Sequence, residues 1–417
     1  MIKAPKGTRD ILPKDSYKWR FVETAARKVC KNFGFGEIRT PTFEFTELFA
    51  RGVGDTTDVV EKQMYTFDDK KGRSITLKPE VTAAVVRAYL EDKLYAEVQP
   101  TKLFYISPCY RYENTQAGRY REFFQFGIEV FGAAEPSMDA EVISLAVAFL
   151  NELGITGLKV GLNSIGCPKC RKEYNERLKE YLRPHYDELC DTCKGRFERN
   201  PLRILDCKSP VCQEIAKGAP VLLDVICEDC RAHFEKLQQY LTGMGIPYDI
   251  DTDIVRGLDY YTKTVFEIQS DTIGAKTAIC GGGRYDGLVA QLGGDPTCGV
   301  GFGLGLDRLI LFMENNGIPF GDKPNTELFI ASMGEDAERY AQTLVYRLRR
   351  AGICAEKDCC GRSLKAQMKY ADKIGAKYTV VLGRNELETG RAALKEMKTG
   401  ESQEIHLDEL ENKLKEE

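Results

Sequence analysis

CYRYENTQAGRYREFFQFGIEVFG, residues 109–132, consists of two stretches rich in aromatic and β-branched residues on either side of a polar loop. The pattern predicts two strands, 98–113 and 122–132, flanking the loop 114–121. Gln125 and Glu129 are separated by an even number of positions, so both side chains leave one face of the second strand. A polar or charged group among apolar neighbours needs a partner, which is either a protein ion pair or a ligand. The stretch therefore predicts a β-sheet with polar groups on one face.

Further strands and helices are predicted around this pair. Strand character recurs at 74–78, 248–254 and 262–269, and a glycine-rich run follows at 281–305. Apolar residues recur at helical spacing in 17–33 and 139–153. The segment EIRTPTFEFTELF, residues 37–49, has extended character, and its Pro41 suits a sheet edge or a subunit boundary.

Two changes of character divide the rest of the chain. From Cys167 to Leu241 charged helical stretches alternate with cysteine pairs, which predicts an inserted subdomain. NNGIPFGDKPN, residues 315–325, is a linker rich in Gly, Pro and Asn. The strand–helix alternation that follows predicts a small α/β domain with a mostly parallel sheet. Its first helix, ending at Arg350, should open with a capping box of Ser332 and Glu335.

Bulk properties exclude some classes of protein. With 417 residues the chain is too long for one core, so two or three domains are expected. The net charge of −4 gives no general sign of nucleic-acid binding, although a local basic face would suffice. The N-terminus lacks a signal peptide, and the longest apolar run, Val142 to Leu150, is too short to span a bilayer. A soluble, cytoplasmic chain with reduced cysteines and no membrane partner is expected.

Three arginines are candidates for binding phosphate. Arg111, Arg256 and Arg308 each lie beside apolar, strand-like sequence, and guanidinium groups grip phosphate oxygens in pairs. A buried ion pair is the alternative for each one alone. The chain's three histidines lie outside these segments, which argues against a Ser/His or Cys/His nucleophilic mechanism. The sequence lacks the GxxxxGK[ST] loop, and the glycines of 281–305 do not form a dinucleotide fingerprint.

Over essentially its whole length the chain resembles the class II aminoacyl-tRNA synthetases, and among them the histidine-specific family. The matching segments are KGTRDILP (6–13), the strand with Pro41, LKPEVT (77–82), the arginine loop 110–129, RGLDYYTKTVFE (256–267), GGGRYDGLVAQLGG (281–294), GLGLDRLIL (303–311) and RSLKAQMKYADKIGAKYTVVLG (362–383). The resemblance implies an α+β catalytic domain built on an antiparallel sheet, residues 1–322, with a Cys-rich helical insertion at about 167–241. A C-terminal α/β anticodon-binding domain is implied at 326–417.

The resemblance also implies a reaction and its residues. The family joins histidine to ATP, releases pyrophosphate, and transfers histidine from the adenylate to tRNA(His), with Mg²⁺ accompanying ATP. Arg256 and Arg111 are the implied catalytic residues, and Arg111, Glu113 and Arg308 the implied ATP ligands. The implied histidine-binding residues are Glu80, Thr82, Gln125, Glu129, Tyr260, Tyr261 and Tyr285.

The loop expected to meet the tRNA acceptor end contains Gln116 and Arg119. It departs from the family's pattern at Asn114 and Thr115, where Arg-Pro is usual. A homodimer is implied, and the main partner of Glu129 is expected to be the ligand, so that folding should not depend on this residue. A histidine-sensing, non-catalytic relative is the alternative, but such relatives lack the C-terminal domain and degrade RGLDYY, which are both intact here.

The cysteines of the insertion suggest structural zinc. Cys167-x2-Cys170 and Cys190-x2-Cys193 have the spacing of one four-thiolate site. A second site could be formed by Cys207, Cys212, Cys227 and Cys230. The alternative is that all eight are small buried apolar residues of a reduced protein.

Overall fold

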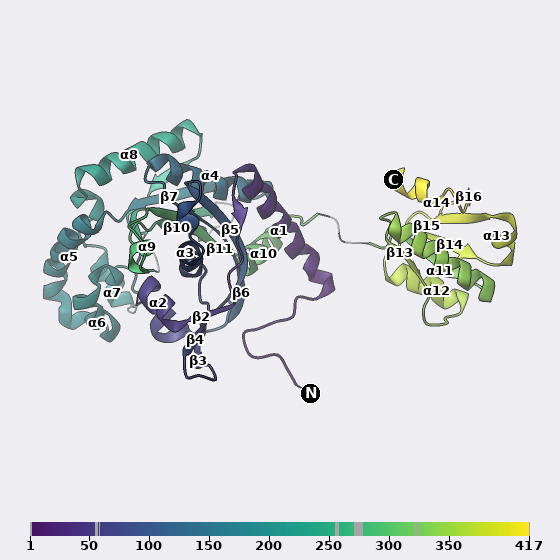
Figure 1. Ribbon diagram of the computed structural model, residues 1–417, viewed down its shortest axis with the longest axis horizontal. Helices are drawn as coiled ribbons and strands as arrows, with labels where there is room; N and C mark the ends of the chain where they lie inside the picture. Colours follow the sequence, from purple (N-terminus) through teal and green to yellow (C-terminus); the bar gives the residue numbers. More distant parts are fainter. Residues whose placement is uncertain are drawn as a thin grey trace. The chain divides into compact units, whose positions relative to one another are not determined.

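The computed structural model of the chain describes residues 2–54, 57, 59–254, 258–270, 278–321, 323 and 325–416. The chain divides into two units, Met1–Gly321 and Asp322–Glu417 (Figure 1). Each unit has its own hydrophobic core. Among the described residues, no helix combines the length and the apolar character needed to cross a membrane.

Unit 1 is built on an eight-stranded sheet in the order β1-β5-β6-β11-β10-β9-β7-β8. The strands are β1 (Gly36–Glu37), β5 (Thr101–Tyr110), β6 (Glu122–Phe131), β7 (Leu158–Ser164), β8 (Tyr248–Ile250), β9 (Thr262–Ser270), β10 (Ala278–Arg284) and β11 (Gly299–Gly305). The five pairings from β5 to β7 are antiparallel, and only the edge strands β1 and β8 pair in parallel. The predicted antiparallel sheet is confirmed.

Strict alternation in β6 and β11 separates the two faces of this sheet. Phe126, Ile128 and Val130 are fully buried in the main core, and Val300, Phe302 and Leu304 of β11 join the same core. The intervening positions of β11 are the glycines of GVGFGLG, so the opposite face of this strand carries no side chains. Since side chains alternate across a strand, one face packs and the other stays open.

Four helices contribute to the packed core: α1 (Pro13–Asn32), α4 (Pro136–Glu152), α8 (Glu228–Gly243) and α10 (Leu306–Asn315). Helix α1 brings in Trp19, the only tryptophan of the chain, which is 7% exposed. Its ring lies edge-on to Phe124 with a centroid separation of 5.2 Å. The helices predicted at 17–33 and 139–153 correspond to α1 and α4.

On the opposite face of the sheet, α3 (Thr82–Glu91) and α9 (Leu288–Gln291) pack in a second apolar cluster. They contact α2 (Thr46–Val53), which also packs against a small sheet of β2 (Phe43–Phe45), β4 (Ser74–Leu77) and β3 (Tyr65–Asp68). The extended reading of 37–49 is wrong at its end, because α2 begins at Thr46. Leu48, Phe49 and Val53 are spaced to bury one side of a helix, and this outweighs the β-propensity of the preceding residues.

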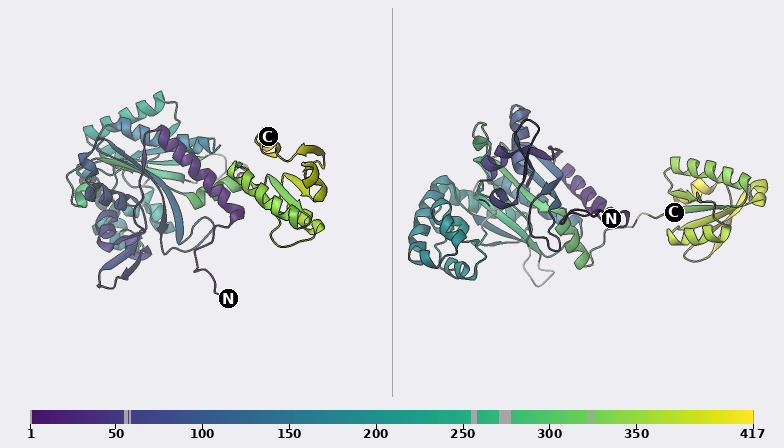
Figure 2. Two further views of the ribbon diagram at one scale, coloured as in Figure 1. Left: turned by 45° about the vertical axis from the view of Figure 1, so that its right-hand side comes forward. Right: turned by 90° about the horizontal axis from the view of Figure 1, so that it is seen from below.

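The insertion folds as short helices that gather at one edge of unit 1 (Figures 1 and 2). They are α5 (Pro168–Leu182), α6 (Asp191–Arg199) and α7 (Pro210–Ala216), followed by α8. Tyr174, Leu178 and Leu182 of α5 are buried together with five of the insertion's cysteines. The insertion therefore packs in one apolar cluster with the rest of unit 1.

Unit 2 contains a five-stranded sheet in the order β13-β12-β14-β15-β16. Its elements are β12 (Leu328–Ser332), α11 (Glu335–Arg350), β13 (Ala355–Lys357), α12 (Leu364–Lys373), β14 (Tyr378–Leu382), α13 (Arg384–Thr389), β15 (Arg391–Glu396), β16 (Ser402–His406) and α14 (Leu410–Glu416). The first three strands of the sheet order are parallel, but β15 and β16 are antiparallel. The three strands that the strand–helix alternation predicts are parallel, as predicted, and β15 and β16, which the sequence analysis did not predict, make the sheet mixed.

Helices cover both faces of the unit 2 sheet. Leu328 and Ile330 of β12 pack with α11, whereas Phe329 and Ala331 pack with α12. The predicted capping box at α11 does not form: β12 continues through Ser332, and the residue preceding the helix is Gly334 with φ 91°. Because Ser332 is the last residue of β12, its backbone is paired in the sheet and cannot start the helix.

Candidate functional site

A cavity of about 390 Å³ lies against the glycine-bearing face of the unit 1 sheet. Its lining includes eleven residues that the sequence singled out: Glu80, Thr82, Arg111, Glu113, Arg119, Gln125, Glu129, Tyr260, Tyr261, Tyr285 and Arg308. Gln116 lies in the same loop and pairs with Arg119 through an isolated β-bridge. Arg256 lies outside the described residues. The structure therefore gathers residues from five distant segments around one space.

Glycines of β11 make room for the polar side chains of β6. A Cβ added at Gly301 would lie 2.3 Å from a carboxylate oxygen of Glu129, and one at Gly303 would lie 2.1 Å from the amide nitrogen of Gln125. The open strand face lets both side chains extend across it. The sequence analysis did not include these glycines in the site, although their alternation was the signal that could have found them.

Glu129 is buried among hydroxyl groups. It is 1% exposed and accepts hydrogen bonds from Thr82 Oγ1 at 2.7 Å, from the Tyr105 hydroxyl at 3.2 Å, and from the Tyr285 hydroxyl. Burial raises the pKa of the Glu129 carboxyl to about 8, although the hydroxyl groups oppose this rise. Three protein hydroxyl groups thus bind Glu129, and the sequence analysis expected none of these contacts. Tyr105 was missed by the sequence analysis.

Glu80 lies at the start of α3. Its carboxylate is 2% exposed and accepts hydrogen bonds from the backbone N–H groups of Thr82 at 2.8 Å and Ala83 at 2.9 Å. Burial raises the pKa of Glu80 against the effect of these bonds. Two buried carboxyl groups thus lie in one region of the cavity, which favours a ligand that brings positive charge or N–H donors.

Three tyrosine rings line the same region. Tyr260 lies 4.8 Å from Tyr261 and 5.6 Å from Tyr285, measured between ring centroids. These rings can enclose a flat ligand, because aromatic groups favour such offset and edge contacts.

The insertion supports the segment that carries Tyr260 and Tyr261. Arg171 of α5 donates to the carbonyl of Asp259 at 3.3 Å and to that of Tyr261. Arg203 donates to the Asp259 carboxylate at 2.9 Å. Neither arginine was singled out from the sequence, and their nearness to cysteine motifs was the only local signal.

The cationic side of the cavity carries the other predicted residues. Arg111 donates to the carbonyl of Pro79 at 2.7 Å, and its guanidinium lies 5.3 Å from the ring centroid of Phe123. The Glu113 carboxylate lies 3.5 Å from Arg119 and 3.9 Å from Arg111. Arg308 is exposed in the first turn of α10, where the helix dipole adds positive potential. This side of the cavity suits phosphate groups.

The N-terminal KGTRDILP segment packs against the same loop. Arg9 forms an ion pair of 2.8 Å with Asp307, whose other oxygen accepts from the backbone N–H of Phe124 at 2.9 Å. The carbonyl of Gly7 accepts from the N–H of Arg121 at 2.7 Å. These contacts fix the start of α10, and with it Arg308, relative to β6.

The arginine of GGGRYDG, Arg284, forms ion pairs within the protein. Arg284 is fully buried and donates to Asp139 at 3.0 Å and to Asp286 at 3.2 Å. Asp139 also contacts His233 at 2.7 Å and Thr264 at 2.6 Å. The network connects α4, α8 and β9 to Arg284, the residue that precedes Tyr285. All three histidines of the chain lie among the described residues, and none lines the cavity.

The insertion's cysteines form two groups, and the predicted grouping is wrong. Cys167 and Cys170 lie with Cys227 and Cys230, whereas Cys190 and Cys193 lie with Cys207 and Cys212. The chain folds back so that the first turns of α5 and α8 meet. The spacing of cysteines along the sequence does not reveal such a contact between distant segments.

Comparisons with known proteins agree with this geometry. A sequence model of the family described as histidyl-tRNA synthetase matches residues 7–170 and 212–309, and one described as anticodon binding domain matches residues 327–417. The chain is 57% identical over 415 residues to the histidine–tRNA ligase of Acetivibrio thermocellus, with 100% of both chains covered. It is 56% identical over 416 residues to that of Clostridioides difficile, covering 100% of this chain and 99% of the relative. The solved apo structure of S. aureus histidyl-tRNA synthetase matches with a TM-score of 0.86 and 44% identity, covering 100% of both chains. The chain belongs to the histidyl-tRNA synthetase family.

Proposed function

We propose that this chain is a histidine–tRNA ligase. It activates L-histidine with ATP to give histidyl-adenylate and pyrophosphate, and then transfers histidine to the 3′ end of tRNA(His). The observation that carries the proposal is a single cavity with buried carboxyl groups and tyrosines in one region and arginines in another. A cationic, ring-bearing amino acid and a triphosphate can therefore meet there.

Histidine would be recognised by its ring and its amino group. Glu129 would accept a hydrogen bond from a ring N–H, while Tyr261, with Tyr260 and Tyr285, would line the imidazole. The α-ammonium group would be held by Glu80, Thr82 and Gln125. A site of buried polar groups rejects ligands that leave those groups unpaired, which would provide the specificity.

ATP would bind along the arginines. Arg111 would hold the α-phosphate and Arg308 the γ-phosphate, with Glu113 near the adenine and Arg256 beside the α-phosphate. The arginines would position the histidine carboxylate for attack and stabilise the charge that develops on phosphorus. Mg²⁺ needs only one or two protein carboxylates beside the phosphates, and the cavity offers Glu267 for this purpose. Bound Mg²⁺ would neutralise phosphate charge.

The tRNA acceptor end would meet the loop with Gln116 and Arg119. A second cavity of about 460 Å³ adjoins this loop, and its lining includes Arg119, Arg196, Arg203 and Lys208. Such a basic surface suits a phosphate backbone, even in a chain of negative net charge. Unit 2 would bind the anticodon, and the enzyme would act as a cytoplasmic homodimer.

ATP–pyrophosphate exchange with each of the twenty amino acids tests this proposal. We expect exchange that depends on histidine and on magnesium and proceeds without tRNA. Robust exchange with another amino acid and none with histidine would overturn it.

The role of Glu129 can be tested in the same assay. Glu129→Gln should lower kcat/KM for histidine at least ~30-fold, about 2 kcal/mol, because the carboxyl group can give up its proton to pair with a protonated imidazole and the amide cannot. Glu122→Gln is the matched control, since Glu122 lies on the same strand but on the opposite face. If Glu129→Gln retains kcat/KM within about threefold of the parent, Glu129 does not read the imidazole.

A further inference from the structure

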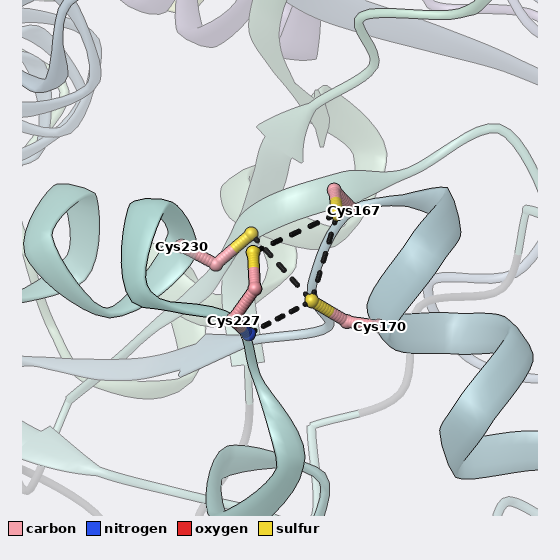
Figure 3. A group of neighbouring side chains, drawn as sticks. All are labelled: Cys167, Cys170, Cys227 and Cys230. Carbon is pink, nitrogen blue, oxygen red and sulfur yellow. Dashed lines mark hydrogen bonds between the residues drawn. The ribbon is translucent and has the colours of Figure 1, made fainter.

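Four cysteine sulfurs meet where α5 and α8 begin, and Figure 3 shows them pointing toward one another. Cys167 Sγ lies 3.5 Å from Cys170 Sγ and 4.0 Å from Cys227 Sγ, and Cys170 Sγ lies 3.9 Å from Cys230 Sγ. A tetrahedral zinc with Zn–S bonds of about 2.3 Å places its sulfurs about 3.8 Å apart. A disulfide would need sulfurs about 2.05 Å apart, and all fifteen cysteines of the chain are free thiols.

A second group of four has the same character. Cys190 Sγ lies 3.8 Å from Cys207 Sγ, and the ligand atoms of Cys190, Cys193, Cys207 and Cys212 all lie within 4.8 Å of one another. This group joins the start of α6 to the segment that leads into α7. It shares no residue with the first group.

We propose that the insertion binds two structural zinc ions, one at Cys167, Cys170, Cys227 and Cys230 and the other at Cys190, Cys193, Cys207 and Cys212. Four thiolates complete the tetrahedral coordination of zinc, so neither site keeps an open position for catalysis. The metal class follows from the ligands, because four soft thiolates favour zinc over magnesium or calcium.

The backbone around the sulfurs favours thiolate ligands over neutral, apolar cysteines. The N–H of Cys227 donates to Cys170 Sγ at 3.1 Å, that of Cys190 to Cys212 Sγ at 3.4 Å, and that of Ser209 to Cys207 Sγ at 3.4 Å. Hydrogen bonds of this kind orient and stabilise a ligand that carries charge. Apolar packing alone would require neither these bonds nor sulfurs gathered four at a time.

The size of the insertion gives the metals a role in folding. Helices α6 and α7 have only 9 and 7 residues, and each buries one cysteine and one large apolar side chain of its own, Phe197 and Ile215. Helices this short are marginally stable on their own, and a metal site that joins them contributes folding free energy. Since Arg171 directly follows Cys170 and donates to the carbonyl groups of Asp259 and Tyr261, the first site also fixes the support of the tyrosine segment.

Metal content of the full-length protein tests the number of sites. Protein purified without chelator should contain about two zinc ions per chain, released in parallel with the modification of eight thiols by a mercurial reagent. A content near one or near zero would overturn the two-site proposal. This outcome is separate from the amino-acid specificity of exchange, which tests the ligase function.

Serine variants test the pairing of the ligands. Cys167→Ser, Cys227→Ser and the double variant should each retain about one zinc, whereas Cys167→Ser combined with Cys190→Ser should retain almost none. Cys354→Ser is the matched control, because Cys354 is exposed in unit 2, and it should keep both ions. If the Cys167 and Cys190 changes together remove no more zinc than either alone, the pairing is wrong.

A measurement on the unmodified protein decides the case if a serine variant fails to fold. Mercurial titration followed by peptide mapping should show Cys167, Cys170, Cys227 and Cys230 modified together with the release of one zinc. Modification of Cys167 and Cys190 in the same step would contradict the proposed sites.

Discussion

Three uncharged hydroxyl groups surround the carboxyl group of Glu129, and they come from α3, β5 and the end of β10. Each can donate to a carboxylate, and Thr82 or a tyrosine oxygen can also accept from a carboxylic acid. Burial outweighs their effect and raises the pKa of Glu129 to about 8. Near neutral pH the ligand-free protein therefore holds this group mainly as the neutral acid.

The raised pKa of Glu129 predicts how stability changes with pH. A carboxyl group with a pKa of about 8 in the folded protein and its ordinary 4.5 when unfolded contributes stability that is complete below pH 4.5. This contribution is lost as the pH rises toward 8. The free energy of unfolding of the parent relative to Glu129→Gln should thus fall by on the order of 2 kcal/mol between pH 5.5 and 7.5. Urea denaturation of both proteins measures it, and parallel pH curves would contradict the shift.

Single residues were predictable where a charged or polar group interrupts apolar sequence. Glu80, Glu129 and Arg111 stand out in this way, and the family resemblance gives their expected roles. Tyr105 and Arg171 could not be found, because each acts on a residue far away in the chain. Only the fold determines such contacts.

At the scale of the element, the two faces of β11 have different roles. Its apolar residues pack into the main core, while its glycines leave the cavity side open to side chains from β6. The backbone of β11 thus lines the cavity, and its glycines add no side chains there.

Two neighbouring glycines of β11 should respond differently to alanine. A Cβ at Gly303 meets the end of the flexible Gln125 side chain, which can move away. Gly303→Ala should therefore leave stability nearly unchanged but lower histidine-dependent exchange about tenfold or more, as for a displaced positioning group. A Cβ at Gly301 lies 2.2 Å from the backbone carbonyl of Ile128, so Gly301→Ala should destabilise unit 1 by about 1–3 kcal/mol.

Urea denaturation and exchange kinetics separate these two outcomes. Gly287→Ala provides the control, because nothing lies within 4 Å of a Cβ added there. Equal destabilisation by the Gly301 and Gly303 changes would show that Gln125 cannot move aside.

Elements were predictable where the pattern is local and long. The helices near 17–33 and 139–153 follow from helical periodicity, and the strands of the 109–132 stretch follow from their aromatic and β-branched residues. The predicted capping box at Ser332 is wrong because this residue belongs to β12. The predicted cysteine grouping is wrong because α5 and α8 begin side by side. Sheet order and ligand pairing depend on contacts between distant segments, which spacing in the sequence does not encode.

On the scale of the whole molecule, the two units have separate cores. Of the residues that the structure describes, the main core of unit 1 contains none beyond Phe320, and the cores of unit 2 begin at Leu328. Every described residue that lines the cavity belongs to unit 1. Ligands of the cavity should therefore stabilise one unit and not the other.

Calorimetry tests this independence. We expect two unfolding transitions, of which only one moves to higher temperature when histidine and ATP are added, because a ligand stabilises the unit that binds it. Unit 2 expressed alone should unfold at the temperature of the unmoved transition. One transition that shifts as a whole would contradict independent unfolding.

Trp19 gives the molecule a built-in optical reporter. It is the only tryptophan, it lies buried in unit 1, and its ring contacts Phe124, the neighbour of Gln125. Light that excites tryptophan alone leaves unit 2 silent, whereas circular dichroism detects the helices of both units. Emission and dichroism recorded on one sample thus separate the melting of the unit that holds the cavity from that of its neighbour, with no label and no mutation.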